Sequence, residues 1–284
     1  MSETREWQGG WTAREPIQLG HVSMPADAGN WAPSARAGVE SRDLGLIGAS
    51  DGAMSVAHLR SADGAEGGGW QRHDLDFQFL YVTGGSVTIE QPGGDPVELG
   101  EGAVVHRTGG GWHRELSFSP GFEAYEITSP ARFSTETAEG PGEDDSRTEI
   151  SFDLPEAYER GAGPRKFFDY RDLGTMEPTD GRVHIHVVKA TGEPGDGTGW
   201  HYHTMAQWFL ILSGDSHIRV EDGPNTPLLP GDTMCVGYGP GQRHNVAPFS
   251  GDYAVLEMCV PAIYETTATE PPENAQPGLP GARE

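Results

Sequence analysis

The feature that most constrains the fold of this chain is an internal repeat. Short segments recur in the same order, and the offset between the two occurrences stays between 129 and 131 residues. Ordered matches at so constant a spacing indicate two copies of one unit of roughly 90–100 residues. The matching pairs are Arg42–Gly45 with Arg171–Gly174, Asp51-Gly52 with Asp180-Gly181, Gly69-Trp70 with Gly199-Trp200, Gln78 with Gln207, Gly85 with Gly214, His113 with His244, and Glu126 with Glu257.

Each copy is predicted to consist of β-strands. The segments 183–188, 207–212, 217–220 and 253–260 are short, rich in β-branched or aromatic residues, and bounded by Gly, Pro, Asp or Asn. No segment has a long apolar period of 3.6 residues. The 41 Gly and 22 Pro residues agree with many short strands and frequent turns. We therefore expect an all-β chain.

The repeat also predicts the domain boundaries. The first unit covers residues 40–133 and follows an N-terminal extension over residues 1–39. The second unit covers residues 168–263. Between the units, residues 134–167 are acidic, contain Gly and Pro and have few apolar side chains, so we expect an exposed linker with a short helix near 154–161. Residues 264–284 are rich in Thr, Glu and Pro, and we expect a disordered tail there.

The charge excludes two classes of partner. Nineteen Lys and Arg against 43 Asp and Glu give a net charge of −24, and such a surface repels phosphate backbones and anionic lipids. The N-terminus has no apolar signal-peptide core, and the longest apolar runs are about five residues, where a membrane helix needs roughly 20. The two cysteines do not make a disulfide framework. We therefore expect a cytoplasmic protein that binds neither nucleic acid nor membranes.

Three histidines of the second unit form a pattern suited to a metal ion. His201 and His203 alternate along a strand and project to the same side, and Gln207 has the same parity. His244 from a neighbouring strand would complete a face of three imidazoles. Neutral imidazole is the most common ligand of divalent first-row metals, and three nitrogens on one side leave coordination positions open. We therefore predict one divalent transition metal on His201, His203 and His244.

This pattern resembles the cupin superfamily. The first motif of that family reads Gly, five residues, His-x-His, three or four residues, Glu, six residues, Gly. Residues 195–214 match it except that Gln207 replaces the Glu. The second motif is matched by Gly231-Asp232, Gly241 and His244, although the loop between them is about two residues longer than the family pattern.

The resemblance covers about residues 40–130 and 168–263, and it implies a bicupin: two tandem jelly-roll β-barrels. In that family the two His of the first motif, its Glu and the His of the second motif hold Fe, Mn, Ni, Cu or Zn. Bicupins often associate further through sheet edges, so we expect a homodimer.

The Gln at position 207 changes the chemistry that the resemblance implies. An amide is neutral, is a weaker donor than a carboxylate, and cannot act as a base. Gln207 either ligates the metal or hydrogen-bonds to the residues around it, and the sequence leaves both roles open. Chemistry that needs the family Glu as a base is disfavoured. His186, on the strand before the first motif, is a candidate for acid–base catalysis.

Three-His cupins of the quercetinase and gentisate-dioxygenase type fit better by resemblance. We therefore favour Fe(II), with O₂ as co-substrate, in the dioxygenation of a small enolic, phenolic or 1,3-dicarbonyl substrate. Mn, Ni, Zn and Cu remain alternatives, because N-donor sites bind several ions. Two other functions stay open: a non-redox lyase, isomerase or hydrolase using Zn or Ni, and a bicupin that binds a small molecule without turnover.

The metal site of the first unit is degenerate. Gln71 stands where the second unit has His201, which leaves His73, Gln78 and His113 as candidate donors. With only two imidazoles, we expect this second site to bind a metal weakly or not at all.

Overall fold

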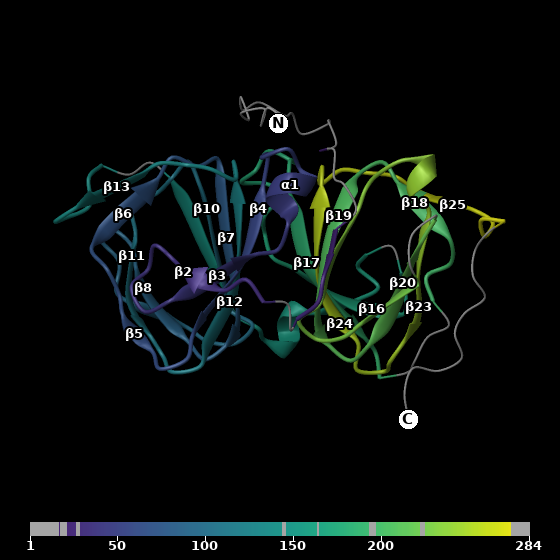
Figure 1. Cartoon of the computed structure of the whole chain (residues 1–284), viewed down its shortest axis with the longest axis horizontal. Coiled ribbons are helices and arrows are strands. Elements are labelled where there is room, and N and C mark those ends of the chain that lie inside the picture. The colour runs from purple at the N-terminus through teal and green to yellow at the C-terminus, as the bar shows by residue number, and fades with distance from the viewer. Residues whose placement is uncertain are drawn as a thin grey trace. The chain divides into compact units, whose positions relative to one another are not determined.

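The computed structural model describes residues 17, 22–26, 29–143, 146–163, 165–192, 197–221 and 225–273 (Figure 1). The chain divides into two compact units. Unit 1 comprises Met1–Gly9 and Gly29–Leu154, and unit 2 comprises Gly10–Ala28 and Pro155–Glu284. Both units consist mainly of antiparallel strands, which confirms the expected all-β fold class. The described residues contain one short α-helix, α1 (Leu46–Ala49).

Unit 1 is built from one large sheet, one smaller sheet and a two-stranded ribbon. A core of Val, Leu, Ile and Phe side chains, including Val82, Val105 and Phe118, draws on both the large and the smaller sheet. In spatial order the large sheet is β14 (Arg147–Ser151), β10 (Val104–Thr108), β7 (Phe77–Gly84), β12 (Phe122–Ser129), β4 (Ser55–Ser61), β3 (Glu40–Asp43) and β2 (Ala32–Pro33). The smaller sheet is β5 (Ala65–Glu66), β11 (Arg114–Phe118), β8 (Val87–Glu90) and β9 (Val97–Leu99), and the ribbon is β13 (Thr135–Ala138) with β6 (Trp70–His73).

Unit 2 repeats this plan with two sheets and a core that draws on both, including Phe209, Val236 and Phe249. The larger sheet is β1 (Val22–Met24), β22 (Thr233–Val236), β19 (Ala206–Ser213), β24 (Ala254–Val260), β17 (His184–Ala190), β16 (Phe168–Asp172) and β15 (Glu159–Arg160). The other is β21 (Asn225–Leu228), β20 (Ser216–Val220), β23 (His244–Phe249), β18 (His201–His203) and β25 (Thr266–Ala268).

The two units share their strand register as well as their strand order. Leu80 lies opposite Glu126 in unit 1, and Phe209 lies opposite Glu257 in unit 2. The repeated glycine also has a structural reason. Gly214 turns the chain between β19 and β20 with φ of +65°, and a Cβ there would meet the backbone nitrogen of Tyr253 at 2.7 Å. The repeat in the sequence is therefore a repeat in the structure.

Three segments that we expected to be irregular contain strands. The segment 134–167 holds β13, β14 and β15, and the short helix expected near 154–161 is a single 3-10 turn at Pro155–Ala157. Within the N-terminal extension, β1 pairs with β22. Within the expected tail, β25 pairs with β18, while residues 274–284 lie outside the described residues.

The physical reason is the same in each case. A barrel strand at a sheet edge has unpaired backbone groups, and a short segment with β-branched residues can satisfy them even when its side chains are polar and exposed. The three residues of β25, Thr266–Ala268, are all exposed. Because its residues are exposed and mostly polar, β25 could not be predicted from composition.

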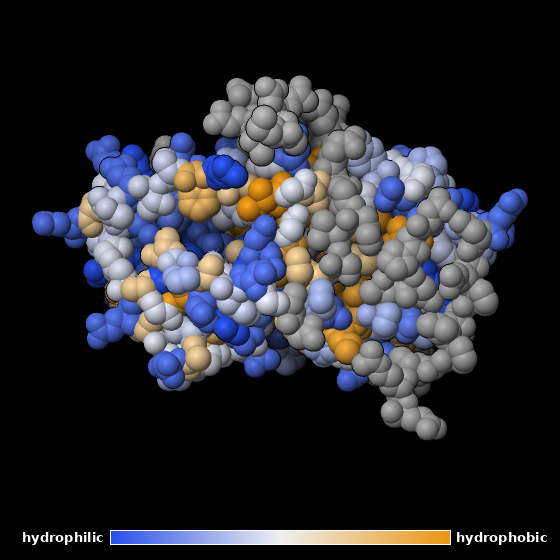
Figure 2. Space-filling model, viewed as in Figure 1, coloured by the Kyte–Doolittle hydropathy of each residue, from blue (hydrophilic) through white to orange (hydrophobic). Residues whose placement is uncertain are grey.

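The described surface agrees with the acidic composition. Figure 2 shows hydrophilic residues over much of the described surface on this face, with hydrophobic residues in smaller groups. Among the described residues no helix is both long enough and apolar enough to span a bilayer.

Candidate metal centre

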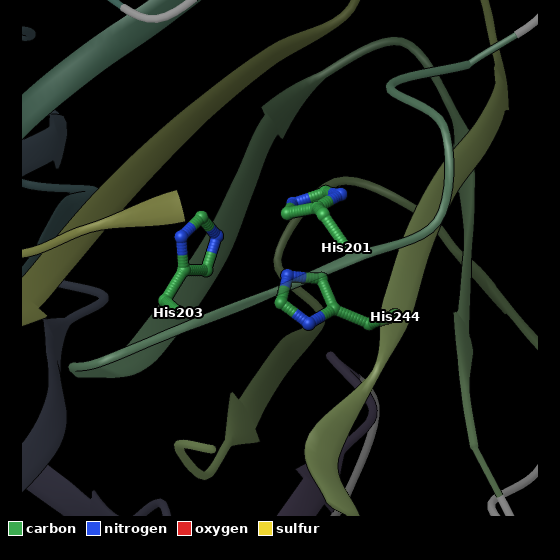
Figure 3. A group of neighbouring side chains, drawn as sticks. All are labelled: His201, His203 and His244. Carbon is green, nitrogen blue, oxygen red and sulfur yellow. The ribbon is translucent and has the colours of Figure 1, made fainter. Parts of the chain in front are cut away.

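His201, His203 and His244 come together in unit 2. One ring nitrogen from each lies within 4.8 Å of those from the other two, and Figure 3 shows the three rings grouped around one small space. β18 positions His201 and His203 two residues apart on one side of the strand, and the pairing of β18 with β23 places His244 directly opposite His201. All three are buried, with exposed fractions of 5%, 5% and 1%.

Hydrogen bonds determine which nitrogen of each ring is available. His201 Nδ1 lies 2.6 Å from Gly199 O, and His244 Nδ1 lies 3.1 Å from Gln242 O. A carbonyl oxygen only accepts, so each Nδ1 carries the proton and each Nε2 keeps its lone pair. His203 Nδ1 lies 2.8 Å from Thr266 Oγ1 on β25, a hydroxyl that is able to accept in the same way. With Nδ1 hydrogen-bonded in each ring, the three Nε2 atoms are the nitrogens left to face the shared space.

The surroundings also keep these rings neutral. Burial, together with the neighbouring imidazoles, lowers the pKa of His203 to about 4 and of His244 to about 3. Burial lowers the pKa of His201 as well. A neutral imidazole is the form that binds a cation, so at neutral pH no proton competes for these three Nε2 atoms.

Gln207 and Glu257 form a second layer beside the histidines. Glu257 is a buried carboxylate on β24 that accepts a short hydrogen bond from Gln207 Nε2 on β19. Because a carboxylate only accepts, the amide nitrogen must face Glu257, and Gln207 Oε1 remains buried without a partner. An orphaned buried oxygen at the edge of a three-His face suits a fourth metal ligand.

Glu257 also holds His186. His186 Nε2 lies 3.2 Å from Glu257 Oε2, and together with the Gln207 contact this hydrogen bond outweighs burial and lowers the pKa of Glu257 to about 2. Cys259 lies close by, and His186, Glu257 and Cys259 form a second cluster of metal-ligand type. Burial raises the pKa of the Cys259 thiol well above its usual range, so it stays protonated and donates to Glu257 instead of ligating.

The three histidines open into a cavity of about 610 Å³, including its mouth. Phe168, Phe209, Val246 and Val255 form its apolar walls. Polar groups converge on the same space: His186, Gln207, Glu257, Arg165, Tyr170, Tyr253, Tyr264, Thr198 and Thr266. A small apolar chamber with a few convergent polar groups is the usual form of a small-molecule site.

The matching residues of unit 1 also lie close together, but they do not line an open cavity like that of unit 2. His73 and His113 lie with ring centroids 5.2 Å apart, and their Nδ1 atoms contact Thr135 Oγ1 and Gly111 O as in unit 2. Gln71 instead donates to Glu115 Oε2 at 2.7 Å. No group of three His, Cys, Asp or Glu ligands forms in the described part of unit 1. Gln78 donates to Glu126 at 2.8 Å, as Gln207 does to Glu257.

An ion-pair network fills this first pocket. Arg36 donates to Glu126 at 2.7 and 3.2 Å and to Glu115 at 3.1 Å, all from one guanidinium. Arg107 Nη1 contacts Gln78 Oε1 at 3.4 Å, so the amide oxygen that is orphaned in unit 2 has a partner here. Only about 170 Å³ of space remains between His73, Gln78 and His113.

Sequence reasoning missed three contributors to the centre: Glu257, Arg165 and Thr266. The repeat shows Glu257 as the counterpart of Glu126. Its contact with Gln207, however, follows from the pairing of β19 with β24, which the sequence does not show. Arg165 and Thr266 lie in segments that composition assigned to a linker and a tail. A signal did exist for Arg165, because Arg36 precedes it by 129 residues, within the repeat offset.

Comparison with known proteins supports the fold. No known family profile matches the sequence, and no curated protein matches it either. Solved structures do match. A protein described as glyoxylate-induced from Pseudomonas aeruginosa is 12% identical, with a TM-score of 0.60, over 88% of this chain and 93% of that one. Oxalate decarboxylase from Bacillus subtilis, described with Mn(II) centres, is also 12% identical, with a TM-score of 0.59, over 94% and 81%.

A vicilin from Solanum melongena is 11% identical, with a TM-score of 0.59, over 89% of this chain and 88% of that one. These proteins are cupins, and the alignments run across both units. The chain therefore has the bicupin fold. The resemblance deduced from the His-x-His motif is confirmed at the level of fold.

Proposed function

We propose that this bicupin is a mononuclear metalloenzyme acting on a small molecule, with its only active centre in unit 2. His201, His203 and His244 would hold the ion through Nε2, and Gln207 Oε1 would be the fourth donor. The observation that carries the proposal is the set of three neutral imidazoles with their Nδ1 protons already committed, beside an orphaned amide oxygen.

Fe(II)-dependent dioxygenation of a small enolic, phenolic or 1,3-dicarbonyl compound is our first candidate reaction. A bound Fe(II) supplies Lewis acidity towards substrate oxygens and electrons for O₂ chemistry. Four neutral donors support this choice, because they leave the ion its full charge to attract an anionic enolate or phenolate.

The residues of the chain have distinct tasks in that reaction. His186 donates its Nε2 proton to Glu257, so its Nδ1 is the atom that accepts the proton of a substrate hydroxyl. Glu257 stabilises the resulting imidazolium and keeps Gln207 oriented. Phe168, Phe209 and Val246 exclude water from the reacting atoms.

A non-redox reaction is the second candidate, and Glu257 favours it. The pocket contains a buried carboxylate bonded to a histidine, so proton transfer does not depend on the missing family Glu. With Zn or Ni in place of Fe, the same His186–Glu257 pair would serve an isomerase or lyase.

Metal analysis and oxygen uptake test the proposal together. Protein purified without chelator is expected to hold about one equivalent of metal per chain, His203→Ala is expected to hold almost none, and the metal content of the matched His73→Ala is expected to be unchanged.

Oxygen uptake that depends on substrate, with iron-loaded protein and a panel of diketones and catechols, supports dioxygenation. Product formation without oxygen uptake supports the second candidate. Ligand binding that is unaffected by loss of metal in His203→Ala, with neither product formation nor oxygen uptake by the metal-loaded wild type, contradicts both and leaves a binding protein. The homodimer remains a prediction, which light scattering can check.

A further inference from the structure

The two units place an arginine at the same point of the same turn. Arg36 lies between β2 and β3, and Arg165 lies between β15 and β16. Val39 N donates to Arg36 O at 3.1 Å, and Phe168 N donates to Arg165 O at 3.3 Å. The repeat therefore extends to a residue whose side chain reaches the pocket in both units.

In unit 1 the pocket supplies the anions for this arginine. Arg36 is clamped by Glu126 and Glu115, and the oxygens of both carboxylates lie within 3.2 Å of its nitrogens. A guanidinium in a buried pocket binds carboxylates in this forked manner. In unit 1, therefore, the anions bound by this arginine are side chains of the protein itself.

In unit 2 one of these two built-in anions, Glu115, has no counterpart. Register fixes the equivalence: Glu115 lies opposite Ile89, and Val246 lies opposite Ile218, at the repeat offset. Val246 therefore replaces Glu115. In the same way Val236, opposite Gln207, replaces Arg107, opposite Gln78. Two charged side chains of the first pocket have become valines, and the space that they filled is open.

Among the residues that the structure describes, Arg165 has no carboxylate partner. Arg165 Nη2 lies 3.4 Å from His201 Nδ1. That nitrogen points its own proton at Gly199 O, so it cannot also accept from Arg165. The second carboxylate, Glu257, is occupied by His186 and Gln207. An unneutralised guanidinium therefore lines the cavity beside the three histidines.

We propose that Arg165 binds the carboxylate of an anionic substrate, at the place that Glu115 fills in unit 1. The substrate class is a small carboxylic acid with an apolar body, because Phe168, Phe209 and Val246 form the walls next to the anion site. This inference rests on unit 2 being the small-molecule site proposed above, but it does not depend on the metal or the reaction.

Calorimetry with two anions and their neutral isosteres tests this assignment. The probes are benzoate and malonate, with benzamide and malonamide as controls, titrated into the full chain both before and after chelator treatment. Because charge-assisted hydrogen bonds are worth about 1.5–3 kcal/mol, we expect at least one anion to bind about tenfold or more tighter than its amide. Arg165→Gln is expected to remove that preference, and Arg165→Lys to keep part of it.

Two further variants keep the test decisive. Arg160→Gln removes the same charge from an exposed arginine that pairs with Asp169, and it should leave the preference unchanged. Val246→Glu rebuilds the carboxylate of unit 1 in unit 2, and it should abolish anion binding by occupying Arg165. If neither anion binds, if anion and amide bind equally, or if Arg165→Gln keeps the preference, the assignment is overturned.

The metal content of the same samples separates this inference from the proposed function. Anion preference that depends on Arg165, in a protein that holds no metal as purified and takes up none when metal is supplied, would contradict the metalloenzyme and keep the anion site. A protein with one equivalent of metal and no such preference would contradict the anion site and leave the metalloenzyme proposal standing.

Discussion

Arg36 offers the sharpest test of the idea that unit 1 is a filled copy of the site in unit 2. Arg36→Met removes a buried guanidinium and leaves Glu115 and Glu126 without their main counter-charge. Removing one partner of a buried ion pair costs about 3–5 kcal/mol of unfolding free energy. The equivalent substitution in unit 2, Arg165→Met, strands no carboxylate, so its expected cost is below about 1 kcal/mol.

Urea unfolding monitored by circular dichroism and fluorescence measures both variants. Because the two units can unfold in separate transitions, the comparison uses the transition of the unit that carries the substitution. The double variant Arg36→Met/Glu115→Val, which leaves only one stranded carboxylate, should recover part of the loss. Equal costs for Arg36→Met and Arg165→Met would refute the argument.

The pH dependence provides an independent check on the same pair. Arg36 outweighs burial and lowers the pKa of Glu115 to about 2, from 4.5. A carboxyl whose folded-state pKa is depressed contributes stability above pH 4.5 and loses it as the pH falls towards 2. Arg36→Met removes the group that lowers the pKa of Glu115 most, while the burial that raises it remains, so the carboxyl accepts a proton more readily. The stability gap between wild type and variant should therefore narrow as the pH falls from 7 to 4.

Two further predictions use matched positions in the two units. Thr266→Val removes the acceptor for His203 Nδ1 and should weaken metal affinity by about 10–100-fold in a chelator competition, whereas Thr135→Val in unit 1 should change nothing; an unchanged affinity in both would show that β25 does not support the centre. Gln207→Glu places a second carboxylate against Glu257 and should lower the melting temperature of the metal-free protein, a deficit that added metal should reduce. Gln78→Glu in unit 1 should be destabilised equally with and without metal, and metal rescue of that variant would contradict a closed first pocket.

Features that are local in the chain could be predicted from the sequence. The offset of the repeat predicted two units, and the alternation of His201 and His203 along one strand predicted that they share a face. The strand segments around 184–190 and 206–213 are apparent from β-branched and aromatic residues between turn residues. His244 was predicted to complete that face from a neighbouring strand, and the structure places it opposite His201.

Features that depend on pairing between distant strands could not be predicted. Glu257 contacts Gln207 because β24 lies beside β19, and no local pattern carries that information. Thr266 lies in a polar segment that becomes a strand only because β18 has a free edge. The roles of Arg36 and Arg165 emerge only when the two pockets are compared residue by residue, since the substitution that distinguishes them lies on a third element, at Glu115 and Val246.

The position of β1 determines the order in which the protein can be assembled. This strand is synthesised before any strand of unit 1, yet its partner β22 is made only after the whole of that unit. All strands of unit 1 lie in one continuous segment of the chain, so this unit can fold during synthesis. β1, the edge strand of the larger sheet of unit 2, stays unpaired until β22 has been synthesised. A recombinant fragment that starts at Pro155 would lack that strand and expose the backbone of β22, inviting aggregation. Any attempt to study the metal-bearing half alone should therefore reattach residues 10–28.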